Sequence, residues 1–207
     1  MTAPGTPARA SRTMERGILT LFLAAAAVIG VGLAVPAIRH VLAVLSAETP
    51  VTLLTRAPVP HDAGSGGVSL VAASFDSASV LATGLSDAAR VLLALGAAAD
   101  ALTTILTAGS VALFFLLLMW RRPFHRALIV ATQVAGAALL LGGVLSAGLA
   151  GLGRMMAADE LNAIADDVFV VGFEIEPAWI LAGLAVLALS FVFSYGTRLQ
   201  RDTEGLV

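Results

Sequence analysis

A chain of 207 residues that is 58% hydrophobic and only 13% charged does not have the composition of a soluble domain, because soluble domains are typically about 45–50% apolar and about 25% charged. The mean hydropathy of +0.94 indicates an integral membrane protein, in which lipid solvates the apolar surface. A net charge of -2 argues against a nucleic-acid-binding surface, and the absence of cysteine excludes disulfides, thiolate metal sites and cysteine nucleophiles.

The first predicted transmembrane helix covers residues 17–35, which carry no charged side chain. At about 1.5 Å per residue this run is just long enough to cross a hydrocarbon core of about 30 Å. A secretory signal peptide is the competing interpretation, but the run exceeds the usual apolar region of about 7–15 residues and further apolar segments follow. Residues 1–16 are polar and are expected to form a disordered tail. Pro36 is expected to kink or end the helix.

Residues 46–90 form a long segment outside the predicted membrane core. Turn-forming residues gather at 61–67, which read HDAGSGG, between two stretches at 51–55 and 68–75 that contain apolar and β-branched residues. This arrangement indicates a β-hairpin or a small sheet.

The next apolar stretch, 91–120, is longer than a membrane requires. If Trp120 lies in the aromatic belt at the membrane surface, the hydrocarbon region begins near Ala101. The second span is therefore predicted at about 100–120, with the preceding turns projecting from the membrane. The remaining parts follow in the order third span 127–152, second loop 153–177, fourth span 178–195 and tail 196–207.

The predicted fold class is an all-α integral membrane protein, a bundle of four transmembrane helices with a small extracytoplasmic subdomain that holds the hairpin. Trp179 and Tyr195, at the two ends of the last span, are typical interfacial anchors. The predicted membrane domain covers residues 17–195, between an N-terminal tail of residues 1–16 and a C-terminal tail of residues 196–207.

The arginine distribution predicts the orientation, because short cytoplasmic segments carry an excess of Lys and Arg. All twelve basic residues are arginine. Only Arg39, Arg56, Arg90 and Arg154 lie in the two long loops. The other arginines lie in the two tails and in the connection between the second and third spans, which predicts that both termini are cytoplasmic: Arg9, Arg12, Arg16, Arg121, Arg122, Arg126, Arg198 and Arg201.

Small residues at four-residue spacing are expected to let helices approach closely in lipid. Gly143, Ala147 and Gly151 form such a face on the third span, and a neighbouring stripe contains Gly142 and Ala150. These faces are predicted to pack against other helices of the same chain. A homodimer surface is the alternative.

Two polar residues within the predicted spans are candidates for function. Asp100 is an acidic residue in an otherwise apolar helix, and such carboxylates often serve proton or ion pathways. The alternative is an interfacial aspartate that water or an arginine satisfies. Gln133 in the third span is either a ligand of a transported solute or the donor of an interhelical hydrogen bond.

Other chemical motifs are absent from the sequence. The acidic loop from Asp159 to Glu176 lacks the spacing of an EF-hand, and its acids are expected to be solvated. His40, His61 and His125 are dispersed, and no nucleophile elbow or phosphate-binding loop occurs. No catalytic residue, cofactor or metal is therefore predicted.

The C-terminal segment 179–207, WILAGLAVLALSFVFSYGTRLQRDTEGLV, resembles the end of a family of uncharacterised bacterial four-span membrane proteins, a domain of unknown function. The resemblance includes the preceding text FVVGFEIEP at 169–177. Proteins of that family are often encoded beside a small helix-turn-helix regulator, which implies a cytoplasmic protein partner. The tail residues that carry the resemblance are Gly196, Leu199, Asp202, Glu204, Leu206 and Val207.

The predicted function is that of a non-enzymatic accessory or regulatory membrane protein, with loops outside and a short tail inside. Its expected partners are membrane lipids and a protein bound through the tail or the outer loops, and a homo-oligomer is compatible with the small-residue faces. The rival hypothesis is a small transporter or channel subunit that uses Asp100 and Gln133. A third, an enzyme acting at the outer surface, requires acids that converge in a cleft.

Overall fold

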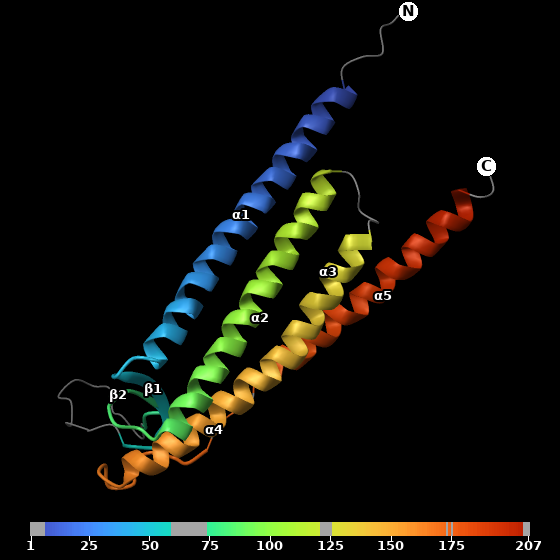
Figure 1. Ribbon diagram of the computed structural model, residues 1–207. Helices are drawn as coiled ribbons and strands as arrows, with labels where there is room; N and C mark the ends of the chain where they lie inside the picture. Colours follow the sequence, from blue (N-terminus) through green and yellow to red (C-terminus); the bar gives the residue numbers. More distant parts are fainter. Residues whose placement is uncertain (1–6, 59–73, 121–125, 173, 175, 205–207) are drawn as a thin grey trace, which may run out of the picture. The chain divides into compact units, whose positions relative to one another are not determined.

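The computed structural model describes residues 7–58, 74–120, 126–172, 174 and 176–204, and the side chains of these residues from 17 to 196. Its elements follow the chain in the order α1 (Pro7–Val44), β1 (Thr49–Leu54), β2 (Ser77–Ala82), α2 (Asp87–Met119), α3 (Arg126–Ala137), the π-helical turn η1 (Ala138–Gly142), α4 (Gly143–Asn162) and α5 (Ala178–Glu204) (Figure 1).

Four stretches of helix are long and apolar enough to cross a membrane, which confirms a mostly helical chain and suggests a multi-pass membrane protein. Each predicted span lies largely within one of them. The stretches are Gly17–Val44, Asp87–Met119, Arg126–Asn162 and Ala178–Gly196.

The helices extend beyond the predicted spans. α1 begins at Pro7, inside the segment expected to be disordered, and it continues through Pro36 to Val44. Proline is tolerated inside transmembrane helices because neighbouring groups satisfy the freed carbonyl. α4 continues to Asn162, because the residues after 152 are rich in the strong helix formers Met, Ala, Glu and Leu. The second loop therefore begins as a helix.

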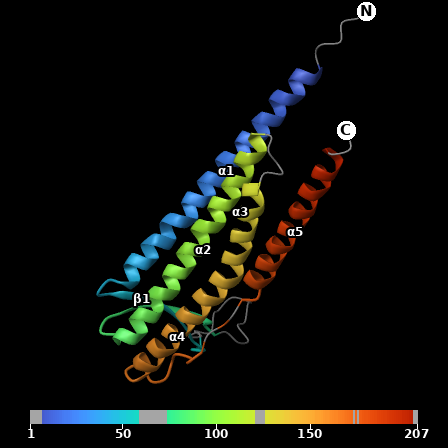
Figure 2. The ribbon, with the colours of Figure 1, turned by 45° about the vertical axis from the view of Figure 1, so that its right-hand side comes forward.

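The chain divides into two compact units. The first contains Met1–Ala37, Asp100–Val144 and Pro177–Val207, and the second contains Ile38–Ala99 and Leu145–Glu176. In the first unit α3 runs beside α5, as Figures 1 and 2 both show. Also in this unit, the rings of Phe22 in α1 and Phe115 in α2 stack with their centroids 5.6 Å apart.

The second unit contains an antiparallel sheet of β1 and β2. Val51 pairs with Val80 and Leu53 pairs with Ala78, so these residues share one face of the sheet. Val51 and Leu53 are buried, whereas Thr52 between them is exposed. The sheet therefore has a buried face. The core also includes Leu85, which precedes α2, and apolar residues of the helices in the same unit: Val44, Leu93, Ala97, Ala157 and Ala158.

The prediction of a small sheet is confirmed, and the strand that pairs with β1 lies after the predicted second strand. β1 covers most of the predicted strand 51–55, whereas β2 lies at Ser77–Ala82, after the predicted strand 68–75. Ser74 forms an isolated bridge with Pro58, and the Phe75 amide donates to the Ala57 carbonyl at 2.9 Å. The predicted turn 61–67 and residues 68–73 lie outside the described residues.

Candidate functional site

The segment after α4 joins the free edge of β1. Thr55 forms an isolated antiparallel bridge with Phe169, and the Val170 amide donates to the Leu54 carbonyl at 2.9 Å. The Thr55 hydroxyl donates to the Val168 carbonyl at 2.9 Å. β1 is therefore bonded on both sides, to β2 and to the residues around 169, and the two loops of the predicted subdomain are bonded to each other.

Asn162, the last residue of α4, closes this segment. Its side-chain amide donates to the Phe169 carbonyl at 2.8 Å, and its side-chain oxygen accepts from the Phe169 amide at 2.9 Å. The side chain thus bonds Phe169 as a neighbouring strand would. The enclosed turn contains Asp166 and Asp167 with φ of 51° and 57°, a left-handed conformation that aspartate tolerates better than most residues.

Asn162→Ala is expected to destabilise the second unit by about 2 kcal/mol, because the amide and carbonyl of Phe169 lose their side-chain partner in a partly buried site. Thermal unfolding in detergent micelles would measure the effect. Asn162→Asp keeps an acceptor for the Phe169 amide and is expected to lose less. An unchanged midpoint for the alanine variant would contradict this role.

The start of α2 is bonded from within the same unit. The Ser86 hydroxyl accepts from the Ala89 amide at 3.3 Å, as an N-cap residue does, and a carboxylate oxygen of Glu160 accepts from the Ser86 amide at 2.9 Å. A negative charge at this end of a helix is favourable. One acid of the predicted solvated loop therefore has a structural role that the sequence pattern did not reveal.

Arg90 donates hydrogen bonds to carbonyl oxygens just after the end of α1. A terminal nitrogen of its guanidinium lies 3.4 Å from the Leu45 carbonyl and 3.2 Å from the Ser46 carbonyl, and it donates to both. Cationic donors are favourable at helix C-termini. The end of α1, the start of α2 and the end of α4 are thus each tied into the second unit by side-chain hydrogen bonds.

Asp100 and Gln133, the predicted polar candidates, are both exposed in the first unit. The buried hydroxyls of this unit lie elsewhere. Thr103 is 7% exposed, and its hydroxyl oxygen is 3.5 Å from the Ala138 carbonyl in η1. The Thr107 hydroxyl is buried without a hydrogen-bond partner in the described part of the chain. Asp100 and Gln133 are therefore not enclosed together in a polar path.

The predicted packing face on the third span contributes only part of the close contacts. A Cβ on Gly143 would lie 3.1 Å from the Trp179 Cβ within the first unit, Gly151 is buried and Ala147 is half-buried. Within the second unit, a Cβ on Gly96 of α2 would lie 2.6 Å from the Ala150 nitrogen. Close packing between α2 and α4 thus uses the neighbouring stripe that contains Ala150.

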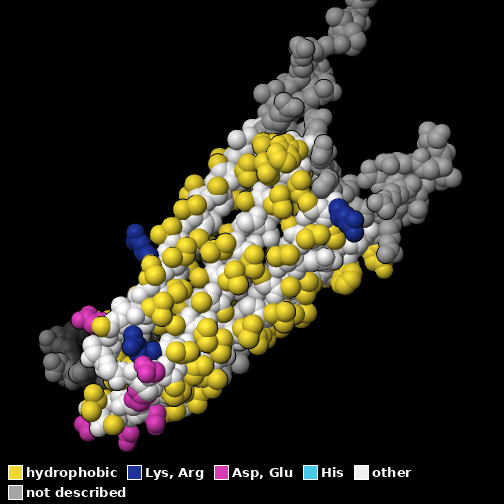
Figure 3. All heavy atoms as spheres, in the orientation of Figure 1, with side chains coloured by type: hydrophobic (Ala, Val, Ile, Leu, Met, Phe, Trp, Pro, Cys, Tyr) yellow, Lys and Arg dark blue, Asp and Glu magenta, His cyan; other side chains and the backbone are white. Residues whose placement is uncertain are grey.

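The acidic side chains of the second loop lie mostly on the surface. Figure 3 shows acidic side chains gathered at the lower end of the view. Among the described residues, no group of His, Cys, Asp or Glu side chains is placed to hold a metal ion. His40 is exposed, and His61 and His125 lie outside the described residues, as do Arg121 and Arg122. The exposed acids of the loop are Asp159, Asp166, Asp167, Glu174 and Glu176.

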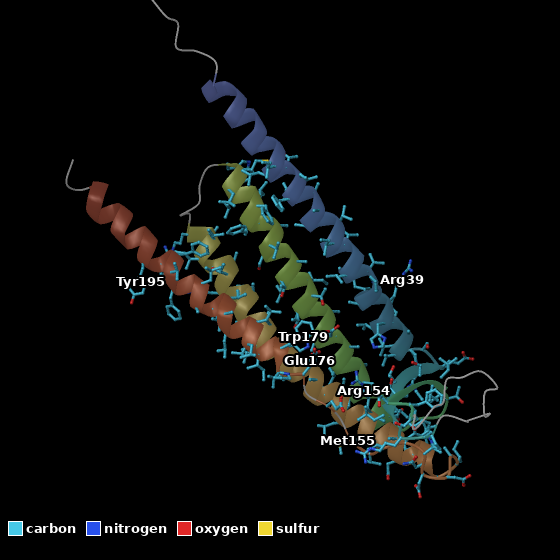
Figure 4. The ribbon with its side chains drawn as sticks, turned by 180° about the vertical axis from the view of Figure 1, so that it is seen from behind. Arg39, Arg154, Met155, Glu176, Trp179 and Tyr195 are labelled. Atoms are coloured by element: carbon cyan, nitrogen blue, oxygen red, sulfur yellow. The ribbon has the colours of Figure 1, made fainter. Side chains whose placement is uncertain are left out.

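The residues predicted to contact a partner through the C-terminal tail lie partly in a helix. Gly196, Leu199, Asp202 and Glu204 all belong to α5, which continues to Glu204. The side chains of the last three, and Leu206 and Val207, lie outside the described residues. Trp179 and Tyr195, the predicted interfacial anchors, are both exposed. Trp179 lies near the start of α5, and Tyr195 lies further along the same helix (Figure 4).

Comparison with protein families, with curated proteins and with solved structures found no match. The resemblance of residues 179–207 to a family of bacterial four-span proteins therefore stays a prediction.

Proposed function

We propose that this chain is a non-enzymatic accessory or regulatory protein of the bacterial cytoplasmic membrane. Both termini are cytoplasmic, the first unit is embedded in the bilayer, and the second unit is an ordered extracytoplasmic domain that binds a protein partner. The observation that carries the proposal is the buried core of the second unit, whose loops are bonded to each other through β1.

The division into units supports the membrane placement. In each spanning stretch, the part that belongs to the first unit is about twenty residues long, which matches a hydrocarbon core of about 30 Å. The boundary in α2 falls at Asp100, where the position of Trp120 predicts the hydrocarbon region to begin. Trp179 follows the boundary at Pro177 by two positions, as an interfacial anchor would.

Two features favour an accessory role over transport: the second unit is held by specific side-chain hydrogen bonds, and the candidate polar side chains of the first unit, Asp100 and Gln133, do not line a path. Folding an external domain costs conformational entropy, and this chain offsets that cost with a buried apolar core and with specific bonds from Asn162, Glu160 and Arg90. A transporter needs polar groups that line one path through the bundle. The exposed side chains of Asp100 and Gln133 do not supply such a path.

The placement is tested by cysteine labelling, since the natural chain has no cysteine. A membrane-impermeant maleimide is expected to label Ser79→Cys, on the exposed side of β2, in intact cells. It is expected to label Ser11→Cys, near the start of α1, only after the membrane is permeabilised. The opposite labelling pattern would reverse the proposed orientation.

Co-purification in mild detergent tests the accessory role. The full chain is expected to carry a stoichiometric protein partner, and a chain that ends at Gly196 is expected to retain it if the second unit makes the contact. Loss of the partner on truncation would move the contact to the C-terminal tail. A partner-free preparation of the full chain would contradict the accessory role.

A further inference from the structure

The turn that follows α4, residues 163–168, presents an apolar side chain to solvent. Ile164 is 84% exposed, the highest value among the large hydrophobic residues of the described chain. Val168, at the end of the turn, and Val171 beyond it are also exposed. Single exposed apolar residues are common, but a group of them on one short segment marks an interaction surface.

The turn is held in place. The Ile164 amide donates to the Leu161 carbonyl at 3.0 Å, and the Val168 amide donates to the Ala165 carbonyl at 3.2 Å. The two Asn162–Phe169 hydrogen bonds close the segment behind it. Ile164 is therefore presented on a fixed backbone, which lowers the entropy lost when a partner binds.

Carboxylates accompany the apolar group. Asp166 and Asp167 lie in the same turn and Asp159 lies on α4, and all three are exposed. Among the residues that the structure describes, no arginine forms an ion pair with them. An exposed apolar side chain in the same turn as exposed carboxylates complements a surface with an apolar pocket and basic residues near it.

We propose that Ile164, with Asp166 and Asp167, is a docking surface for a protein partner that offers an apolar pocket rimmed by Arg or Lys. This inference rests on the proposed extracytoplasmic placement of the second unit.

Lipid and a second copy of the chain fit this surface less well. Anionic lipid would repel the aspartates. In a symmetric dimer through this turn, the same carboxylates would face each other, which costs free energy.

The test is a photo-crosslinking amino acid at position 164 of the full chain in its native membrane. The matched control is the same amino acid at Leu81, an exposed apolar residue on β2. Irradiation is expected to join one protein to position 164 and not to position 81, and the crosslinked peptide of that protein is expected to contain Arg or Lys. Asp166→Asn with Asp167→Asn keeps residues that tolerate the left-handed backbone and is expected to lower the yield about five-fold.

Each other outcome overturns the docking surface. A crosslink to lipid would assign the turn to the membrane, and a crosslink between two copies of the chain would assign it to self-association. An unchanged crosslinking yield in the double Asp→Asn variant would show that the partner does not bind through basic residues. Labelling of Ile164→Cys by an impermeant maleimide tells whether only the docking surface is wrong or the extracytoplasmic placement of the second unit is wrong too. Labelling in intact cells without a crosslink overturns only the docking surface, whereas labelling only after permeabilisation overturns the placement as well.

Discussion

Leu53→Ala is expected to destabilise the second unit by about 2–5 kcal/mol. Leu53 is 1% exposed and lies in β1, on the face of the sheet that meets the core. Truncation removes buried apolar surface and leaves a cavity, and the backbone around Leu53 cannot close that cavity easily, because β1 is bonded on one side to β2 and on the other to the segment around Phe169.

Leu81→Ala is the matched control. It makes the same chemical change in the paired strand, where the side chain is 62% exposed, and it is expected to change stability by less than about 0.5 kcal/mol. The measurement is thermal unfolding in micelles, followed by maleimide labelling of Ala157→Cys, a core position that is 0% exposed, in the background of each variant. Equal labelling rates at one temperature would show that the second unit has no core that depends on Leu53.

The four helices that are long and apolar enough to cross a membrane were predictable, because hydropathy over a window of about twenty residues reports on solvation by lipid. The ends of the helices were not. Hydropathy falls after Val35 and after Leu152, yet α1 continues to Val44 and α4 to Asn162. Backbone hydrogen bonding and helix propensity continue to favour a helix outside the membrane. Hydropathy therefore predicts the stretch that lipid can solvate, but it does not predict where the helix ends.

The second strand was missed for a different reason. Ser77–Ala82 reads SASVLA, which is poor in the β-branched and aromatic residues that mark strands. Its place is set by pairing with β1, where Val80 lies opposite Val51, and by the hydrogen bonds that continue the hairpin toward Ser74. Such pairing is not local, and a single sequence does not encode it as a pattern.

The same limit applies to the candidate site. The acids of the second loop were visible in the sequence, but they did not reveal that Glu160 bonds the start of α2. Nor did they reveal that Asn162 fixes the turn that presents Ile164. These roles depend on which segments meet in space. The small-residue stripes were visible too, but their partners were not, and Gly183 had no part in the predicted packing.

Gly183→Ala is expected to destabilise the first unit by about 1–3 kcal/mol. A Cβ at this position of α5 would lie 2.8 Å from the Leu140 nitrogen and 3.0 Å from the Leu140 Cα, both backbone atoms of η1. A backbone cannot move aside as a flexible side chain can. The other side of η1 is also occupied, because a Cβ on Gly142 would collide with the Thr103 hydroxyl of α2. The π-helical turn therefore packs between α2 and α5 and has little room to shift.

Gly109→Ala provides the control for this prediction. Gly109 also lies in a helix of the first unit, but a Cβ there would meet nothing within 4 Å. It is expected to leave stability unchanged or to raise it by up to about 1 kcal/mol, since alanine favours the helix over glycine. Unfolding in mixed detergent micelles would separate the two variants. Helices associate in lipid through close packing and gain little from hydrophobic burial, so equal behaviour of the two alanines would mean that the contact between Gly183 and Leu140 does not hold α5 in the bundle.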